Sequence, residues 1–115
     1  MKLSLIQMNS GQEREANVAR ACQFIDKAAK GKPDLIVLPE FFNTVYFGQY
    51  RDYRYVAWAE RDDGYTMTRI KEKAVQHGVY LIATIFEEEA LGIYFDTAMV
   101  IDPQGQIMGK YRKTH

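Results

Sequence analysis

The sequence contains one cysteine, two histidines and no net charge, and each scarcity excludes a class of function. A single cysteine cannot form a disulfide within the chain, which is typical of a cytoplasmic protein. Fifteen basic and fifteen acidic side chains cancel, so we expect no electrostatic attraction to nucleic acid or to an anionic membrane. No apolar run approaches the roughly 18 residues of a membrane span. Gln7 and Asn9 interrupt the apolar N-terminus, so we also expect no signal peptide.

Patterns that would bind a metal or an organic cofactor are also missing. His77 and His115 have no cysteine or acid at the spacing of zinc ligands, and no glycine-rich phosphate loop is present. The acidic run Glu87-Glu88-Glu89 is more typical of a solvated turn than of a metal cluster. We therefore expect no zinc site and no phosphate-binding glycine loop.

The first part of the chain shows the alternation of strand and helix patterns that is typical of an α/β domain. Leu3–Met8 has the length of a short buried strand. Apolar side chains from Val18 to Ala29 recur at helical spacing, and Ser10 with Glu13 predicts a capping box that opens this helix. Leu35–Leu38 is a continuous apolar run, as in a strand covered on both faces. Together these segments predict a βαβ unit with a right-handed crossover.

The second part of the chain predicts one more helix and three more strands within a single domain. Residues 41–64 are aromatic and charged without a clean period, and we predict a long structured loop there. No repeat, linker or low-complexity tract divides the chain, and its length fits one domain. The predicted elements are a helix over 66–77 ended by Gly78, strands over 79–86, 93–101 and 106–112, an acidic turn over 87–92 and a tight turn over 102–105.

Glu40 is the first candidate for chemistry. It follows Leu38-Pro39 at the carboxyl end of a predicted buried strand, where open α/β sheets bind their ligands. Pro39 offers no N–H, so we expect strand pairing to stop there. A carboxylate in such a place can be desolvated and made into a general base. The alternative is a solvated glutamate at the end of a strand.

Lys113 and Cys22 are the other two residues that could react. Lys113 ends the last predicted strand within a basic run, and the ordinary explanation is an exposed strand edge protected by lysine. Cys22 is the only thiol. Its place on the apolar face of the first helix is that of a small buried hydrophobe, whereas a nucleophile needs an open, electropositive setting.

Two segments resemble the signatures of a known family. Leu-Ile-Val-Leu-Pro-Glu-Phe-Phe-Asn over 35–43 resembles the first signature of the nitrilase, or carbon–nitrogen hydrolase, superfamily. Gly-Lys-Tyr-Arg-Lys-Thr-His over 109–115 is similar to the second. The opening Leu-Ile-Gln-Met and the later Asp-Pro-Gln-Gly also fit, in the right order. The resemblance implies the N-terminal part of an αββα sandwich, with a mixed sheet and helices. Residues 1–115 would then form a single incomplete domain.

The resemblance also implies a reaction. By match to the two motifs, Glu40 corresponds to the general base of the family and Lys113 to its catalytic lysine. The nucleophilic cysteine lies on a third motif beyond residue 115, and Cys22 does not match it. The implied activity is hydrolysis of a non-peptide carbon–nitrogen bond through a thioester, without metal or cofactor. We expect the chain to be inactive alone.

Substrate and partners follow from the same resemblance. Tyr46-Phe47-Gly48-Gln49 and Phe86-Glu87-Glu88-Glu89 resemble the N-carbamoylputrescine amidase branch, which implies a small amide or carbamoyl-amine substrate. Phe95-Asp96-Thr97 departs from the family, whose members commonly have Tyr-Asn-Ser or Tyr-Asn-Thr there. The expected partner is a second copy of the chain or a C-terminal half that supplies the cysteine. The alternative function is a non-catalytic interaction or dimerisation module. In either case an open half-sandwich should expose apolar surface and be a poor monomer.

Overall fold

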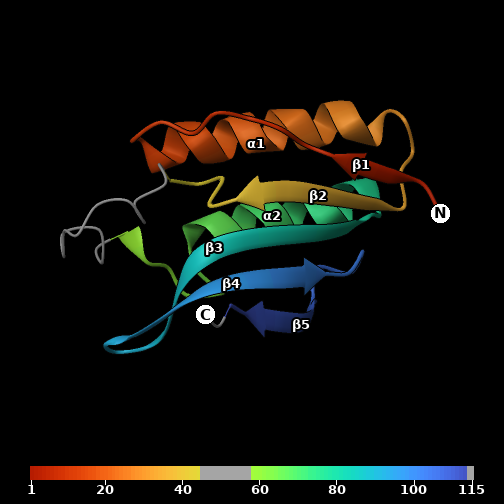
Figure 1. Cartoon of the computed structure of the whole chain (residues 1–115). Helices are drawn as coiled ribbons and strands as arrows, with labels where there is room; N and C mark the ends of the chain where they lie inside the picture. The colour runs from red at the N-terminus through yellow and green to blue at the C-terminus, as the bar shows by residue number, and fades with distance from the viewer. Residues whose placement is uncertain (45–57, 114–115) are drawn as a thin grey trace.

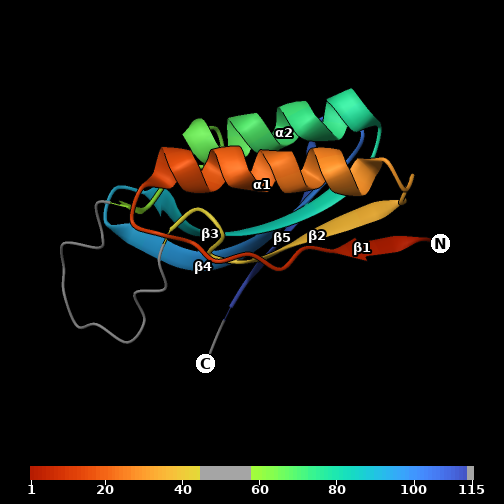
Figure 2. The ribbon, with the colours of Figure 1, turned by 90° about the horizontal axis from the view of Figure 1, so that it is seen from above.

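The computed structural model describes residues 1–44 and 58–113. Within these ranges the chain forms one five-stranded sheet with two helices packed on the same face (Figures 1 and 2). The strands lie in the order β1-β2-β3-β4-β5, parallel from β1 to β3 and antiparallel from β3 to β5. The mixed α/β sheet is therefore confirmed. The elements are β1 Leu3–Leu5, α1 Arg14–Ala29, β2 Leu35–Glu40, α2 Tyr65–His77, β3 Tyr80–Ala90, β4 Ile93–Ile101 and β5 Ile107–Arg112.

The start of α1 differs from the predicted capping box. Glu13 is the N-cap residue, and its side chain makes no capping hydrogen bond. The Ser10 hydroxyl instead donates to the Phe42 carbonyl, 2.6 Å away. Buried Asn17 holds the preceding loop by accepting from the Gly11 N–H and donating to the Gly11 carbonyl, each at 2.8 Å. The pattern was misleading because a serine three residues before a glutamate can also hydrogen-bond elsewhere.

The acidic turn predicted over 87–92 is also wrong. β3 continues through the glutamates to Ala90, and the turn is confined to Leu91 and Gly92, where Gly92 has a φ of 81°. Glu87 can occupy a strand because cationic side chains of β5 pair with it on the buried side. By contrast, β4 has the predicted bounds, and Gly78 ends α2 in the left-handed conformation with a φ of 61°. Most of the predicted loop over 41–64 lies outside the described residues.

The core lies between the two helices and one face of the sheet. Alternation along the strands places every second side chain on this face, where the largest are fully buried. α2 contributes Met67, Ile70 and Ala74, as its helical spacing predicts. The buried sheet residues include Ile36, Leu38, Leu81, Ala83, Ile85, Met99 and Ile101.

The opposite face of the sheet carries no helix in the described part of the chain, as Figure 2 shows. Apolar side chains are exposed there, with Leu5 at 70% and Met108 at 61%. A hollow of about 610 Å³ on this open face is lined by Met1, Asp34, Leu35, Tyr80, Ile82, Val100 and Met108. None of the described helices is long and apolar enough to span a membrane.

We expect the isolated chain to self-associate through this open face, because contiguous exposed apolar surface of this kind normally forms an interface. Sedimentation velocity over a concentration series should show species larger than 13.3 kDa. Met108→Lys should weaken the association by placing a charge on the open face. Val75→Lys is the matched control, since Val75 is 56% exposed on α2, on the other side of the sheet. A monomer at every concentration would contradict the expectation.

Candidate active site

Glu40 lies at the end of β2, displaced by a bulge. Val37 pairs with Ile82 and Glu40 with Thr84, so β2 uses one residue more than β3 over this step. The strand therefore continues past Pro39, contrary to the prediction that pairing stops there. A bulge is the place where a sheet tolerates proline, because the missing N–H costs no ladder hydrogen bond. The extra residue turns Glu40 away from the helix side, where Leu38 is buried, and onto the open face.

The backbone turns sharply immediately after Glu40. Phe41 has a φ of 53°, which is unusual for a bulky residue, and its N–H donates to the Thr84 carbonyl at 3.0 Å. Such strained positions persist only where surrounding contacts enforce them, and they are frequent beside functional groups. The bulge and this turn together fix the direction of the Glu40 side chain.

Lys113 comes to the same place from the other end of the chain. It follows β5 directly, and its N–H donates to the Asp96 carbonyl at 2.9 Å. Its Nζ lies 3.6 Å from Oε1 of Glu40. Both side chains are accessible, at 52% for Lys113 and 45% for Glu40. The structure therefore brings together the two residues that the motifs singled out.

A cavity of about 350 Å³ surrounds this pair on the open face. Ladder partners form a row across four strands, from Glu40 through Thr84 and Ala98 to Tyr111. Asp96 lies two residues from Ala98 along β4, and Lys113 lies two residues from Tyr111, so both side chains are next to this row on the same face. The lining residues are Glu40, Thr84, Asp96, Ala98, Tyr111 and Lys113.

Asp96 is the most perturbed group in the cavity. Burial, the hydrogen bond with Glu40 and the negative charge of Glu40 raise the pKa of Asp96 to about 7, against a partial opposing effect of Lys113. Sequence reasoning identified Asp96 only as a departure from the family pattern. Its nearness to Glu40 could not be predicted, because it depends on the bulge in β2.

The other cations of the basic run lie on the opposite side of β5. Lys110 Nζ is 2.5 Å from Oε2 of Glu87, and Arg112 Nε is 3.3 Å from Oε1. Thr97 also donates to Glu87, at 2.9 Å. Burial opposes ionisation of Glu87, but these partners outweigh it and the pKa of Glu87 is lowered. We call Glu87, Thr97, Lys110 and Arg112 the Glu87 cluster.

A second buried carboxylate that the sequence did not reveal is Glu60. Its oxygens accept from Asn43 Nδ2 at 2.9 Å, from the Thr66 N–H at 3.0 Å and from the Thr66 hydroxyl. The Glu60 backbone pairs with β3 beside Glu87. Because Asn43 follows Glu40 by three residues, this network fixes the segment that leaves the cavity. Glu60 lies in an aperiodic stretch, so no pattern marked it.

Cys22 is far from this chemistry. Its side chain is buried at 4% exposure on α1, and burial raises the pKa of the thiol. A protonated, enclosed thiol is a poor nucleophile. The structural interpretation of Cys22 is therefore confirmed, and the cavity contains no thiol of the described residues.

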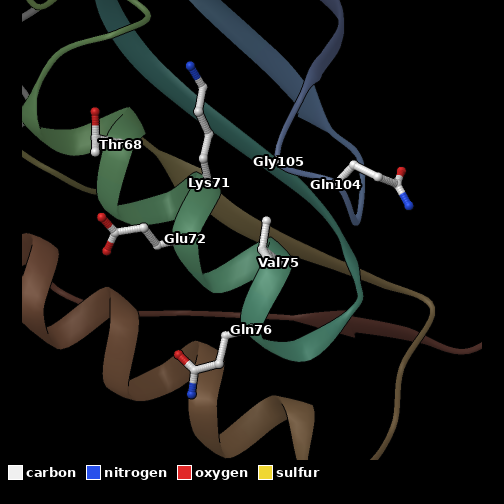
Figure 3. Close-up of a pocket in the computed structure, with 7 residues that line it drawn as sticks. All are labelled: Thr68, Lys71, Glu72, Val75, Gln76, Gln104 and Gly105. Carbon is white, nitrogen blue, oxygen red and sulfur yellow. The ribbon is translucent and has the colours of Figure 1, made fainter.

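Another hollow, of about 480 Å³, lies between α2 and the β4–β5 turn. Figure 3 shows Val75 projecting from α2 toward Gln104 and Gly105, whereas Glu72 and Gln76 point away from that turn. Lys71, the cation of this hollow, donates to the Asp62 carbonyl at 2.8 Å. It is a packing groove on the helix side of the sheet, away from Glu40. Across the described residues no group of three or more His, Cys, Asp or Glu side chains is placed to hold a metal ion.

Comparison with known proteins finds relatives that cover almost the whole chain. Human omega-amidase NIT2 is 35% identical over 114 residues, which are 99% of this chain and 40% of that protein. The carbon-nitrogen hydrolase from Helicobacter pylori G27 superposes with a TM-score of 0.92 at 26% identity, over 100% of this chain and 40% of that one. An N-terminal amidase structure with a Gln-Gly peptide gives a TM-score of 0.85 at 29% identity, over 99% of this chain and 28% of that one.

The chain thus spans two fifths or less of these relatives. The sequence profile of the family described as carbon-nitrogen hydrolase matches residues 2–115. The fold, the sequence identity and the family profile all lead to one assignment, and the chain belongs to the carbon-nitrogen hydrolase family.

Proposed function

We propose that this chain provides the glutamate and the lysine of an amide-hydrolysing site whose cysteine comes from a segment outside residues 1–115. The observation that carries the proposal is the approach of the Glu40 carboxylate and the Lys113 ammonium to 3.6 Å in an accessible cavity. One group can accept a proton and the other can stabilise a developing negative charge. These are the two roles that acyl transfer to a thiol requires.

The residue types fit a defined sequence of steps. Glu40 takes the proton of the incoming thiol, and the thiolate attacks the amide carbonyl carbon. Lys113 stabilises the negative charge that develops on the carbonyl oxygen. The C–N bond then breaks, the amine or ammonia leaves with the proton held by Glu40, and a thioester remains. Glu40 next takes a proton from water as the water oxygen attacks the thioester. The C–S bond breaks, the acid is released, and Glu40 returns the proton to the thiolate.

The open face leaves room for a further segment that carries the cysteine. Glu40 and Lys113 lie on the same face as the exposed apolar hollow. A segment that covered this face would bury the apolar surface and could bring a thiol to the cavity in the same step. Residues 1–115 would then be one incomplete domain of a longer assembly.

The substrate class rests on relatives and on motifs. The human relative is an omega-amidase, and structures of the N-terminal amidase carry peptides that begin with Gln or Asn. Glutamine and asparagine side chains each end in a primary amide, and we propose a small molecule with a terminal –CONH₂ group as substrate. The motif resemblance to the carbamoylputrescine branch adds N-carbamoyl amines as the alternative, which have the same –CONH₂ end.

The test compares residues 1–115 alone with a joined protein, in which they are fused to the part of human omega-amidase NIT2 beyond the matched segment. We expect ammonia release from primary amides by the joined protein only, and its loss after thiol alkylation. A panel of omega-amides, Gln- or Asn-terminal peptides and N-carbamoyl amines identifies the substrate class. A joined protein that unfolds cooperatively yet turns over none of them would contradict the proposal. So would turnover by residues 1–115 alone.

The exposed apolar face also favours a second candidate function, a non-catalytic interaction module. In that case residues 1–115 would bind a second copy through the open face without any dependence on Glu40 or Lys113. Stable dimers together with an inactive joined protein would support this alternative.

A further inference from the structure

We propose that Asp96 is a positioning residue for Glu40, which it engages by sharing one proton between the two carboxyl groups. This inference rests on the proposed function for its catalytic meaning, although the shared proton itself is a property of residues 1–115. In this arrangement Asp96 is the neutral acid and the donor, and Glu40 remains the carboxylate that accepts.

The position of Asp96 in β4 supports this role. It lies on the same face as Ala98 and lines the cavity with Glu40 and Lys113. Its side chain lines the cavity beside that of Glu40, and its carbonyl accepts the Lys113 N–H at 2.9 Å. One residue therefore contacts both members of the candidate pair, one through its side chain and the other through its backbone.

The charges around the cavity show why a proton is needed. Its titratable lining groups are the Glu40 and Asp96 carboxyls, the Lys113 ammonium and the Tyr111 phenol, whereas Thr84 and Ala98 are uncharged. Lys110 and Arg112 are held by Glu87 on the other side of the sheet. A hydrogen bond between two carboxyl groups requires one of them to keep its proton. One proton on the pair leaves one carboxylate opposite one ammonium, which is a neutral set.

The identity of the protonated partner follows from exposure. Asp96 is the more enclosed of the two, and burial is the largest cause of its pKa near 7. Glu40 is 45% exposed, and its carboxylate lies opposite the Lys113 ammonium. Below about pH 7 Asp96 therefore holds the Glu40 carboxylate in place. Above it, a second negative charge develops beside Glu40 and the hydrogen bond is lost.

Asp96→Asn provides a direct test, because an amide donates the same hydrogen bond at every pH. In ¹³C-labelled residues 1–115 we expect the Asp96 carboxyl to titrate near pH 7 and the Glu40 carboxyl signal to respond in the same step. In the Asp96→Asn variant the Glu40 signal should show no step near pH 7. Titration of Asp96 near its ordinary value, or a Glu40 signal that does not respond to Asp96, would overturn the proposal.

Stability supplies a second readout that needs no activity. Because the folded-state pKa of Asp96 exceeds its ordinary value of 3.8, the folded chain binds a proton that the unfolded chain has released between about pH 4 and pH 7. Stability must therefore decline as pH rises across this window. The urea midpoint should fall from pH 5 to pH 7.5 more steeply in the wild-type chain than in Asp96→Asn. Parallel profiles for the two proteins would count against the shared proton.

The catalytic meaning is tested in the joined protein. The ratio of kcat/KM for Asp96→Asn to that of the wild type should rise as pH passes through 7, and other titrations cancel in this ratio. Asp96→Ala, which has no donor, should lower kcat/KM throughout. A ratio that does not depend on pH overturns the positioning role. If the joined protein hydrolyses no amide but Asp96 and Glu40 respond together near pH 7 in residues 1–115, the proposed function fails and the shared proton stands.

Discussion

Glu40→Gln should lower the amide hydrolysis of the joined protein about a thousandfold, the usual size of a lost general base. Glutamine preserves the length of the side chain and can still accept a hydrogen bond from Asp96. It cannot take a proton from a thiol. The loss should therefore appear in kcat, with little change in KM. Steady-state ammonia release at pH 7 measures it.

The matched control for this exchange is Glu15→Gln, which neutralises an exposed carboxylate in the first turn of α1. It should leave kcat/KM within a factor of two or so, because surface substitutions have small effects. Alkylation of the cysteine by iodoacetamide should also slow in Glu40→Gln, since the base no longer generates the thiolate. If Glu40→Gln keeps wild-type turnover while remaining folded, Glu40 is not the base.

Glu87→Gln should destabilise residues 1–115 by about 3 kcal/mol, because it removes the buried charge between Lys110 and Arg112, whose remaining partners Asp62 and Glu89 are far more exposed. Glu87 is 1% exposed and accepts from Thr97, Lys110 and Arg112. Glutamine keeps the volume but cannot balance the two cations. Urea denaturation at pH 7 measures the change, which is a large share of the 5–15 kcal/mol of an ordinary domain.

Glu88→Gln is the control for this second exchange, since the neighbouring side chain projects to the other face of β3 and is only half-buried. We expect almost no change in the urea midpoint there. The wild-type chain should also lose the contribution of Glu87 in acid. The pKa of Glu87 lies below its ordinary value of 4.5, so its stabilisation is present above that value and disappears as pH falls through the folded-state pKa. Equal midpoints for Glu87→Gln and Glu88→Gln would contradict the role of the Glu87 cluster.

The regular elements of this chain could be predicted because their signals are local. Helical spacing of Met67, Ile70 and Ala74 and the stop at Gly78 define α2, and the apolar run of β4 has the predicted bounds. The errors arose where distant partners decide the structure. Glu87 lies within β3, where Lys110 and Arg112 of β5 pair with its side chain.

The candidate site was predictable in its residue types but not in its electrostatics. Glu40 and Lys113 stand in motifs, and the motifs named both. The carboxyl of Asp96 beside Glu40 depends on the bulge at Pro39, and a bulge has no periodic signature. Glu60 supports the segment after Glu40 through contacts that no sequence pattern records.

The alternation of side chains along β5 has one further consequence, which concerns preorganisation. Lys110 and Arg112 bind Glu87 on one face, while Tyr111 and Lys113 line the cavity on the other. A shift of β5 by one residue in its register with β4 would move every side chain of β5 to the opposite face of the sheet. Because the ion pairs on the helix side fix this register, they also fix the position at which Lys113 enters the cavity. Lys113 is thus held beside Glu40 by contacts that lie on the far side of the sheet.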